Sequence, residues 1–183
     1  MTSRWRLFYL VYLSQPATDR ALYRAINRRE VRSILEIGVG TGRRAVRMIQ
    51  VAQRRCPDSQ VCYVGVDQFE ARATDEEAGL PLKAAYQMLR RTGARVRLLP
   101  GDPLTAISRA ANSMAKVDLL VVSGGLSRPS LASAWLYIPR LLSDQSLVVQ
   151  GRFDESGRPA GFRVVSARHV EELAMRAAGR RAA

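Results

Sequence analysis

Residues 33–42 read SILEIGVGTG, a short apolar strand that carries the acid Glu36 near its end and runs directly into three alternating glycines. This pattern predicts a strand that turns tightly into a helix, because glycine adopts the positive φ angles of such turns and leaves backbone N–H groups exposed. Without a Cβ, the turn also lets a ligand approach the backbone closely. We therefore expect a nucleotide-like ligand at the end of this strand.

The spacing of the glycines narrows the class of ligand. A dinucleotide site follows G-x-G-x-x-G, whose third glycine packs helix against strand. Here Arg43 stands at that position, and the third glycine comes one residue earlier. The pattern E-x-G-x-G-x-G instead resembles motif I of the class I S-adenosylmethionine-dependent methyltransferases. The resemblance implies a cofactor-binding turn, around the amino-acid end of S-adenosylmethionine, made by Glu36, Gly38, Gly40, Thr41 and Gly42.

Three further segments continue the resemblance, which covers roughly residues 20 to 150. The run 61–67 predicts a buried strand that ends at Asp67, where the family binds ribose. A carboxylate accepts two hydrogen bonds from a vicinal diol and belongs at the carboxyl end of a strand, facing the crevice. The run 95–102 resembles the third strand, with Asp102 where the family contacts the adenine amino group. The run 117–125 resembles the fourth strand and adds Ser123 to the implied cofactor site.

The fold class that follows is α/β, a doubly wound and mostly parallel sheet flanked by helices. Residues 146–150 predict a fifth strand, and the turn-rich connection 152–161 leads at once into 162–166, which predicts an antiparallel edge hairpin and a truncated carboxyl-terminal end. We expect one domain, divided into an amino-terminal lid or packing segment (1–30), a core (31–150), and a hairpin with a terminal helix (151–183). The expected helices after the first strand cover 45–52, 82–91, 103–114, 129–142 and 169–178.

The amino-terminal segment is the most aromatic part of the chain. Thr18 or Asp19 is expected to cap a short helix that runs to about Arg29. The segment either lies over the cofactor crevice as a lid or packs against the sheet. The apolar run 7–13 is short and contains two tyrosines, so we do not interpret it as a signal peptide, and no other run approaches membrane-spanning length. Cys56 and Cys62 are too few for a disulfide framework or a zinc site, which favours a reducing, cytoplasmic location.

The formal net charge of +13 is large for 183 residues, and only two of the 29 basic residues are lysines. Arginine's planar fork suits phosphate, so one interpretation is a phosphate-binding surface. The other is that the scattered arginines, including Arg43, Arg44 and Arg47 on one helix, coat solvated faces. Aromatic interleaving that would stack bases is missing, which favours the second interpretation, with weak and nonspecific nucleic-acid binding. Such a field would still attract anionic substrates.

The acceptor half of the expected site is poorly represented. Residues 122–127 resemble the fourth motif of the small-molecule O-methyltransferase branch, Asp-Gly-Asp-His, whose acids bind a divalent metal. This chain has Ser123, Gly125 and Leu126 at those positions, a poor divalent site, so we expect no metal. His169 is the only histidine, and we expect it to be exposed or capping rather than a base. No catalytic residue is assigned.

The resulting hypothesis is a metal-independent methyltransferase that uses S-adenosylmethionine on a small-molecule acceptor, by positioning donor and acceptor in line. One alternative is a catalytically inactive relative that serves as a binding or interaction protein. The second is an RNA methyltransferase or nucleic-acid binder, although the Asn/Asp-Pro-Pro-Tyr signature of base-methylating enzymes is missing.

Overall fold

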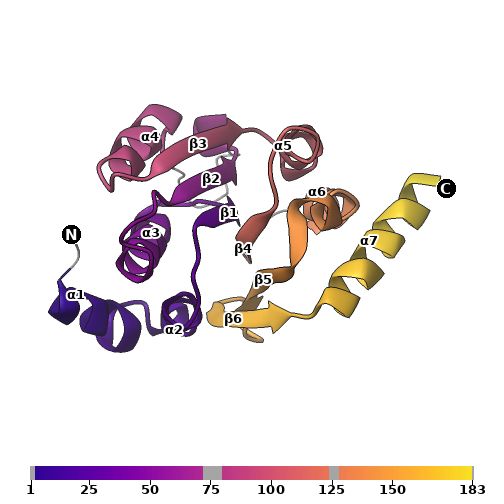
Figure 1. The fold of residues 1–183 in the computed structure, drawn as a ribbon. Helices are drawn as coiled ribbons and strands as arrows, with labels where there is room; N and C mark the ends of the chain where they lie inside the picture. The colour runs from indigo at the N-terminus through magenta and orange to yellow at the C-terminus, as the bar shows by residue number, and fades with distance from the viewer. Residues whose placement is uncertain (1–2, 72–79, 124–127, 183) are drawn as a thin grey trace.

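One sheet organises the computed structural model, which describes residues 3–71, 80–123 and 128–182 (Figure 1). Its strands are β1 (Ser33–Ile37), β2 (Cys62–Asp67), β3 (Arg95–Pro100), β4 (Val117–Val122), β5 (Leu142–Phe153) and β6 (Pro159–Val165). The helices are α1 (Arg4–Phe8), α2 (Arg20–Asn27), α3 (Arg43–Arg55), α4 (Leu82–Arg90), α5 (Pro103–Ala110), α6 (Arg128–Ala134) and α7 (Ala167–Ala182). Shorter helical turns are η1 (Tyr9–Leu13), η2 (Ala17–Asp19), η3 (Phe69–Ala71) and η4 (Ile138–Leu141).

The strand order β3-β2-β1-β4-β5-β6 makes the sheet doubly wound. From β1 the chain moves outward through β2 and β3, and then returns to place β4 on the other side of β1. These strands and β5 are parallel, whereas β6 pairs with β5 in the antiparallel sense. The predicted fold class and the antiparallel edge hairpin are therefore confirmed. Ligands of such sheets bind outside the carboxyl ends of the strands where the order reverses, which here is between β1 and β4.

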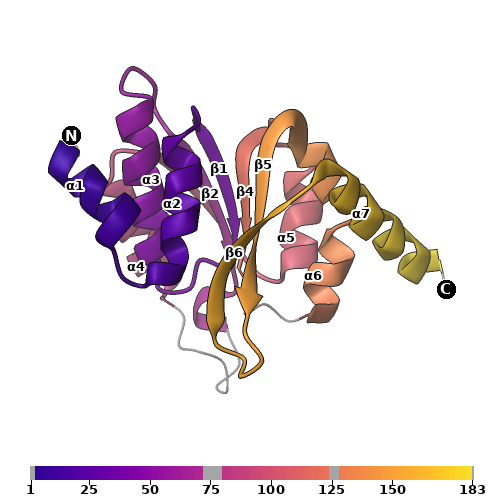
Figure 2. The ribbon, with the colours of Figure 1, turned by 90° about the horizontal axis from the view of Figure 1, so that it is seen from below.

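Helices cover both faces of the sheet. Figure 2 shows α1 to α4 on one side and α5 to α7 on the other. Successive residues of a strand point to opposite faces, so Ile34 belongs to the apolar cluster under α2 and α3, and Leu35 to the cluster under the second helical layer. By the same alternation Glu36, two residues after Ile34, points toward α3.

The amino-terminal segment packs on the first face of the sheet. Its buried side chains belong to the same apolar cluster as the inner side of α3, and they are Leu10, Val11, Leu22 and Ile26. For these residues the structure shows packing against the sheet, the second of the two alternatives. Asp19 stands at the N-cap position of α2, one of the two predicted, but its side chain accepts no hydrogen bond from a backbone N–H of the helix, because η2 continues into α2 and leaves Asp19 in helical geometry. Its Oδ2 instead accepts a hydrogen bond from the hydroxyl of Tyr23 at 3.3 Å. None of the described helices is both long and apolar enough to cross a membrane.

Two predicted helices end earlier than their apolar patterns suggested. The predicted helix 129–142 is divided into α6 and η4: Pro139 lacks a backbone donor and so cannot continue α6, but it fits the first turn of η4. The predicted helix 103–114 ends at Ala110, before Asn112 and Ser113, whose side chains favour turns. The hairpin is tightened by Asp154, which accepts hydrogen bonds from the N–H groups of Ser156 and Arg158.

Candidate functional site

The glycine turn joins β1 to α3 as predicted. Gly38, Gly40 and Gly42 have φ angles of 89°, 60° and 72°, in the left-handed region that favours glycine. The N–H of Gly38 donates to the carbonyl of Val66 at 2.8 Å, which ties the start of the turn to β2. A Cβ built on Gly40 would meet no described atom within 4 Å. The turn therefore exposes backbone toward open space at the carboxyl end of β1, and Thr41 is an exposed residue of the same turn.

A glycine in β2 makes room for this turn. Gly65 pairs with Glu36 across the two strands. A Cβ on Gly65 would come within 2.8 Å of Cγ2 of Val39 and 3.0 Å of Cδ2 of Leu98. The turn can sit this low over β2 only because residue 65 has no side chain.

Asp67 ends β2 and is linked to the turn. Its Oδ2 accepts a hydrogen bond from the N–H of Gly40 at 2.8 Å, and its Oδ1 accepts one from the N–H of Phe69 at 3.3 Å. The side chain is 3% exposed. Asp67 therefore lies beside the glycine turn at the carboxyl edge of the sheet, in the place expected for a diol-binding acid.

Asp102 lies after β3 and caps α5. Its Oδ2 accepts hydrogen bonds from the N–H groups of Leu104 at 3.0 Å and Thr105 at 3.4 Å, and its Oδ1 accepts one from the hydroxyl of Ser130. The carboxylate is thus fixed at the same edge of the sheet as Asp67. The polar connection between Asp67 and Leu80, predicted to border the adenine pocket or to form a solvated loop, falls largely on residues 72–79, outside the described residues.

Glu36 forms a buried network with α3 and β2. Its side chain is 0% exposed; Oε1 accepts a hydrogen bond from Nε of Arg44 at 2.8 Å, and Oε2 accepts one from the hydroxyl of Tyr63 at 2.5 Å. Burial raises the pKa of Glu36, against the opposing effects of the Arg44 charge and the two hydrogen bonds. Burial also raises the pKa of Tyr63, reinforced by the neighbouring carboxylate.

Arg44 does not fit the interpretation that the arginines cover solvated faces. Its side chain is only 21% exposed, and besides Glu36 its Nη2 donates to the carbonyl of Gly38 at 2.9 Å and to the hydroxyl oxygen of Ser123. Ser123 in turn donates to the carbonyl of Gly38 at 2.6 Å, and Cζ of Arg44 lies 5.4 Å from the centre of the Phe162 ring. The guanidinium thus connects the ends of β1 and β4. Arg44 and Tyr63 are site residues that sequence reasoning missed.

The structure describes only one of the three residues on which the prediction of metal independence depends. Ser123 is placed as described above, but Gly125 and Leu126 lie outside the described residues. Within the described ranges, no group of three or more His, Cys, Asp or Glu side chains could hold a metal ion. Metal independence stays a prediction.

His169 lies on the first turn of α7. Its Nδ1 is 3.3 Å from Oε2 of Glu172, and its N–H donates to the hydroxyl of Ser166 at 3.3 Å. It is partly exposed, at the helix that follows the edge strand β6, as expected for a residue outside the crevice. Trp135 is buried in the apolar cluster of the second face.

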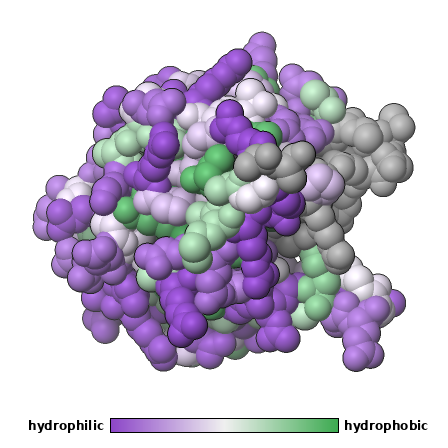
Figure 3. All heavy atoms as spheres, turned by 90° about the vertical axis from the view of Figure 1, so that its right-hand side faces the viewer, coloured by the Kyte–Doolittle hydropathy of each residue, from purple (hydrophilic) through white to green (hydrophobic). Residues whose placement is uncertain are grey.

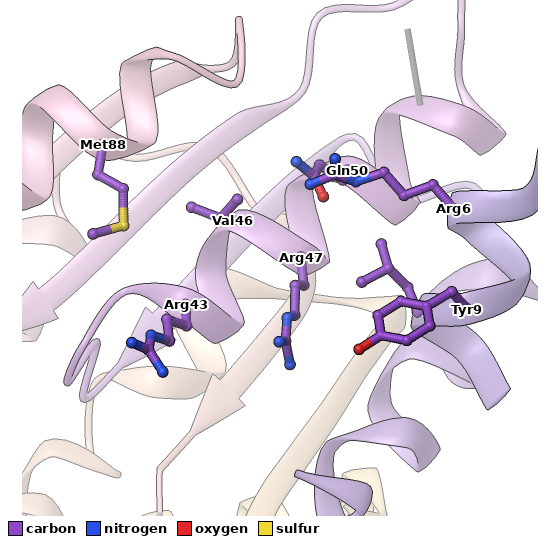
Figure 4. Close-up of a pocket in the computed structure, with 8 residues that line it drawn as sticks. Arg6, Tyr9, Arg43, Val46, Arg47, Gln50 and Met88 are labelled. Carbon is purple, nitrogen blue, oxygen red and sulfur yellow. The ribbon is translucent and has the colours of Figure 1, made fainter. Parts of the chain in front are cut away.

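A hollow of about 480 Å³ lies on the outer side of α3, between this helix, α4 and the amino-terminal segment. Figure 4 shows Arg47 of α3 between Arg43 and Tyr9, with Met88 on the side away from Tyr9. Helix α3 separates this hollow from the sheet, because its opposite face carries the buried residues Ala45, Met48, Ile49 and Ala52. The hollow is an open, arginine-rich depression and not the crevice at the strand ends.

Solved structures are similar to this chain, although no protein-family model matches it and no curated protein matches its sequence. The O-methyltransferase TomG from Streptomyces achromogenes, involved in tomaymycin synthesis and solved in complex with S-adenosylmethionine, superposes with a TM-score of 0.58 at 18% identity, over 94% of this chain and 77% of that one. A TehB-like S-adenosylmethionine-dependent methyltransferase from Corynebacterium glutamicum superposes with a TM-score of 0.53 at 20% identity, over 95% of this chain and 78% of that one.

These likenesses define the class of structure. The chain has the fold of class I S-adenosylmethionine-dependent methyltransferases. Identities this low establish the fold and leave the ligand and the reaction to be argued from the chain's own residues.

Proposed function

We propose that this protein binds S-adenosylmethionine and transfers its methyl group, without a metal, to a small-molecule acceptor. The observation that carries the proposal is the arrangement at the carboxyl ends of β1 and β2, where the glycine turn opens onto space and the Asp67 carboxylate lies hydrogen-bonded beside it. The place is the switch point of a doubly wound sheet, where such folds bind ligands.

The residues present fit this cofactor. No atom of the described residues lies within 4 Å of the place where a Cβ of Gly40 would stand, so the turn can hold a ligand against its backbone. The Asp67 carboxylate accepts a hydrogen bond from the N–H of Gly40 and so lies beside the turn, where we place the ribose. Asp102, held by α5 and Ser130, follows the next strand, β3, and we assign it to the adenine amino group. We assign Gly38, Thr41 and Gly42 to the same cradle, and Glu36 acts through Arg44.

Bound S-adenosylmethionine would supply a methyl group that is already activated by its sulfonium. The chain's task is then to orient the donor and exclude water, and no general base is needed when the acceptor is a good nucleophile. Ser123, at the position where the resembled metal-binding branch has an acid, donates a hydrogen bond to the carbonyl of Gly38 and accepts one from the guanidinium of Arg44. This supports a mechanism that depends on positioning.

A second candidate is a catalytically inactive relative that binds a ligand or a partner through the same fold. It is favoured by Arg44, whose guanidinium occupies the acceptors Gly38 and Ser123 at the switch point, and by the direct step from β5 into the β6 hairpin without an intervening helix.

Calorimetry with S-adenosylmethionine and S-adenosylhomocysteine tests the proposal. Asp67→Ala removes the acceptor of the diol and should weaken binding by about 1.5–3 kcal/mol, the value of a hydrogen bond to a charged group. Asp118→Ala is the matched control, because Asp118 accepts hydrogen bonds from Arg32, Ser33 and the Ser33 hydroxyl near the start of β4, at the opposite edge of the sheet. The control should keep wild-type affinity. Unchanged affinity in a folded Asp67→Ala variant would refute the assignment, and methyl transfer to candidate acceptors then separates the enzyme from the inactive relative.

A further inference from the structure

The switch point of this sheet carries a fixed positive charge. Arg44 is the second residue of α3, and its guanidinium lies between the turn that follows β1 and the end of β4. Because ligands of doubly wound folds enter between these two strands, any ligand in the crevice meets this guanidinium.

The acceptors around the guanidinium are already used. The Gly38 carbonyl accepts hydrogen bonds from both Arg44 and Ser123, and the Ser123 hydroxyl oxygen accepts from Arg44. A ligand ammonium at this place would compete with Arg44 for both oxygens and would lie against a like charge. The network therefore disfavours a cation at the switch point.

The guanidinium of Arg44, in contrast, still has a hydrogen-bond donor that a ligand can use. Within the described part of the chain, no group accepts a hydrogen bond from Nη1 of Arg44, and 21% of the side chain stays exposed, which leaves a donor for a ligand. The adjoining helix start strengthens the same preference: α3 has 13 residues, begins without a side-chain cap and has no acid in its first turn. Its uncapped N–H groups carry partial positive charge.

We propose that Arg44 determines which end of the ligand's amino-acid tail the site recognises: Arg44 binds the carboxylate, and the site makes no specific contact with the ammonium. The inference rests on the proposed function, since it assumes an adenosyl ligand in the crevice. It makes Arg44 a specificity residue for ligands with an anionic tail. Charge-assisted hydrogen bonds from arginine to a carboxylate are stronger than neutral ones and supply the discrimination.

Four adenosyl compounds separate the two ends of the tail in calorimetry. They are S-adenosylhomocysteine, its analogue without the amino group, its analogue without the carboxylate, and methylthioadenosine, which lacks both. We expect the deaminated analogue to bind within about threefold of S-adenosylhomocysteine, and the decarboxylated analogue to bind about 10- to 100-fold more weakly, as for a lost hydrogen bond to a charged group. A decarboxylated analogue that binds as tightly as S-adenosylhomocysteine would overturn the inference.

Two variants show whether the preference is local to Arg44. In Glu36→Gln/Arg44→Met both members of the buried pair lose their charge together, and the preference for the carboxylate should fall to within about threefold. Arg43→Met removes an equal charge from the neighbouring, exposed residue and should keep the full preference. A preference retained in the double variant contradicts the role of Arg44. If none of the four compounds binds the wild-type protein, the proposed function itself fails, which is a different result from binding with the opposite preference.

Discussion

Replacing Arg44 by methionine removes the guanidinium that pairs with the fully buried carboxylate of Glu36. The Tyr63 hydroxyl remains as a hydrogen-bond donor to Oε2, but Oε1 loses its partner at 2.8 Å. Breaking a buried pair from one side costs about 3–5 kcal/mol, because an uncompensated charge stays behind. We expect a loss of that size in the free energy of unfolding at pH 7.

The loss should depend on pH, and its sign follows from the pKa of Glu36. Burial raises this pKa, and Arg44 is the largest of the effects that lower it, so Arg44→Met raises it further. A carboxyl group with a raised pKa in the folded state contributes its full stability below its unfolded-state value of about 4.3 and loses it as the pH rises. The variant should therefore lose up to about 1.4 kcal/mol per pH unit until the pH passes the folded-state pKa.

Urea denaturation of the wild type, Arg44→Met and Glu36→Gln/Arg44→Met at about pH 5, 6 and 7 measures this effect. The double variant has no carboxyl group at position 36 and should show no additional slope with pH, and its loss should be smaller than that of Arg44→Met. Glu30→Gln, which removes the carboxylate of the exposed Arg32–Glu30 pair, is the surface control and should leave the transition midpoint unchanged. Parallel pH profiles for Arg44→Met and the double variant would refute the reasoning.

Three further outcomes are expected. Methyl transfer should proceed in excess chelator, because Ser123 is a poor ligand for a divalent ion; activity abolished by chelator and restored by magnesium contradicts this. The face in Figure 3 is largely hydrophilic, and the arginines lie on several helices, so RNA binding in a filter assay should be weak, insensitive to sequence and steeply reduced by salt near about 150 mM; tight, sequence-selective binding there would instead favour the nucleic-acid alternative. Gly65→Ala should cost about 1–3 kcal/mol in urea denaturation, because its Cβ would clash with Val39. Gly179→Ala, in open space on α7, should be neutral or stabilising, and equal effects of the two alanines would show that the close packing over β2 is unimportant.

The elements of this fold follow from local signals in the sequence. The first two strands are short apolar runs that end next to a glycine or at an acid, and the glycine turn was recognisable because three glycines alternate directly after β1. Asp102 followed by Pro103 also carries a local signal, since an acid before proline at the start of a helix is an N-cap pattern. Boundaries were less predictable: the apolar pattern runs from 129 to 142, although α6 ends at Ala134 and η4 begins only at Ile138.

The Glu36–Arg44 pair could not be read from helix periodicity. Arg44 lies between Arg43 and Ala45, and its direction depends on how α3 leaves the glycine turn and settles on the sheet. One signal was available: an acid between two buried residues of a strand, Leu35 and Ile37, needs a partner, because burying an unpaired charge is costly. Searching the following helix for a cation at its first turn would have identified Arg44.

The residue type at position 123 determines how much of the Arg44 charge is available to a ligand. A carboxylate at position 123 would place a second negative charge against the guanidinium, whose Nη2 already contacts that side chain. Arg44 would then be shared between two acids and would have little charge left to offer a ligand. With serine at this position the guanidinium is paired with Glu36 and lies within electrostatic reach of Asp19, while the serine hydroxyl fixes it by hydrogen bonds. In the two proposals above, the serine that replaces a metal-binding acid is thus also the residue that leaves the Arg44 charge available to a ligand, so metal independence and a preference for an anionic tail would have the same structural cause.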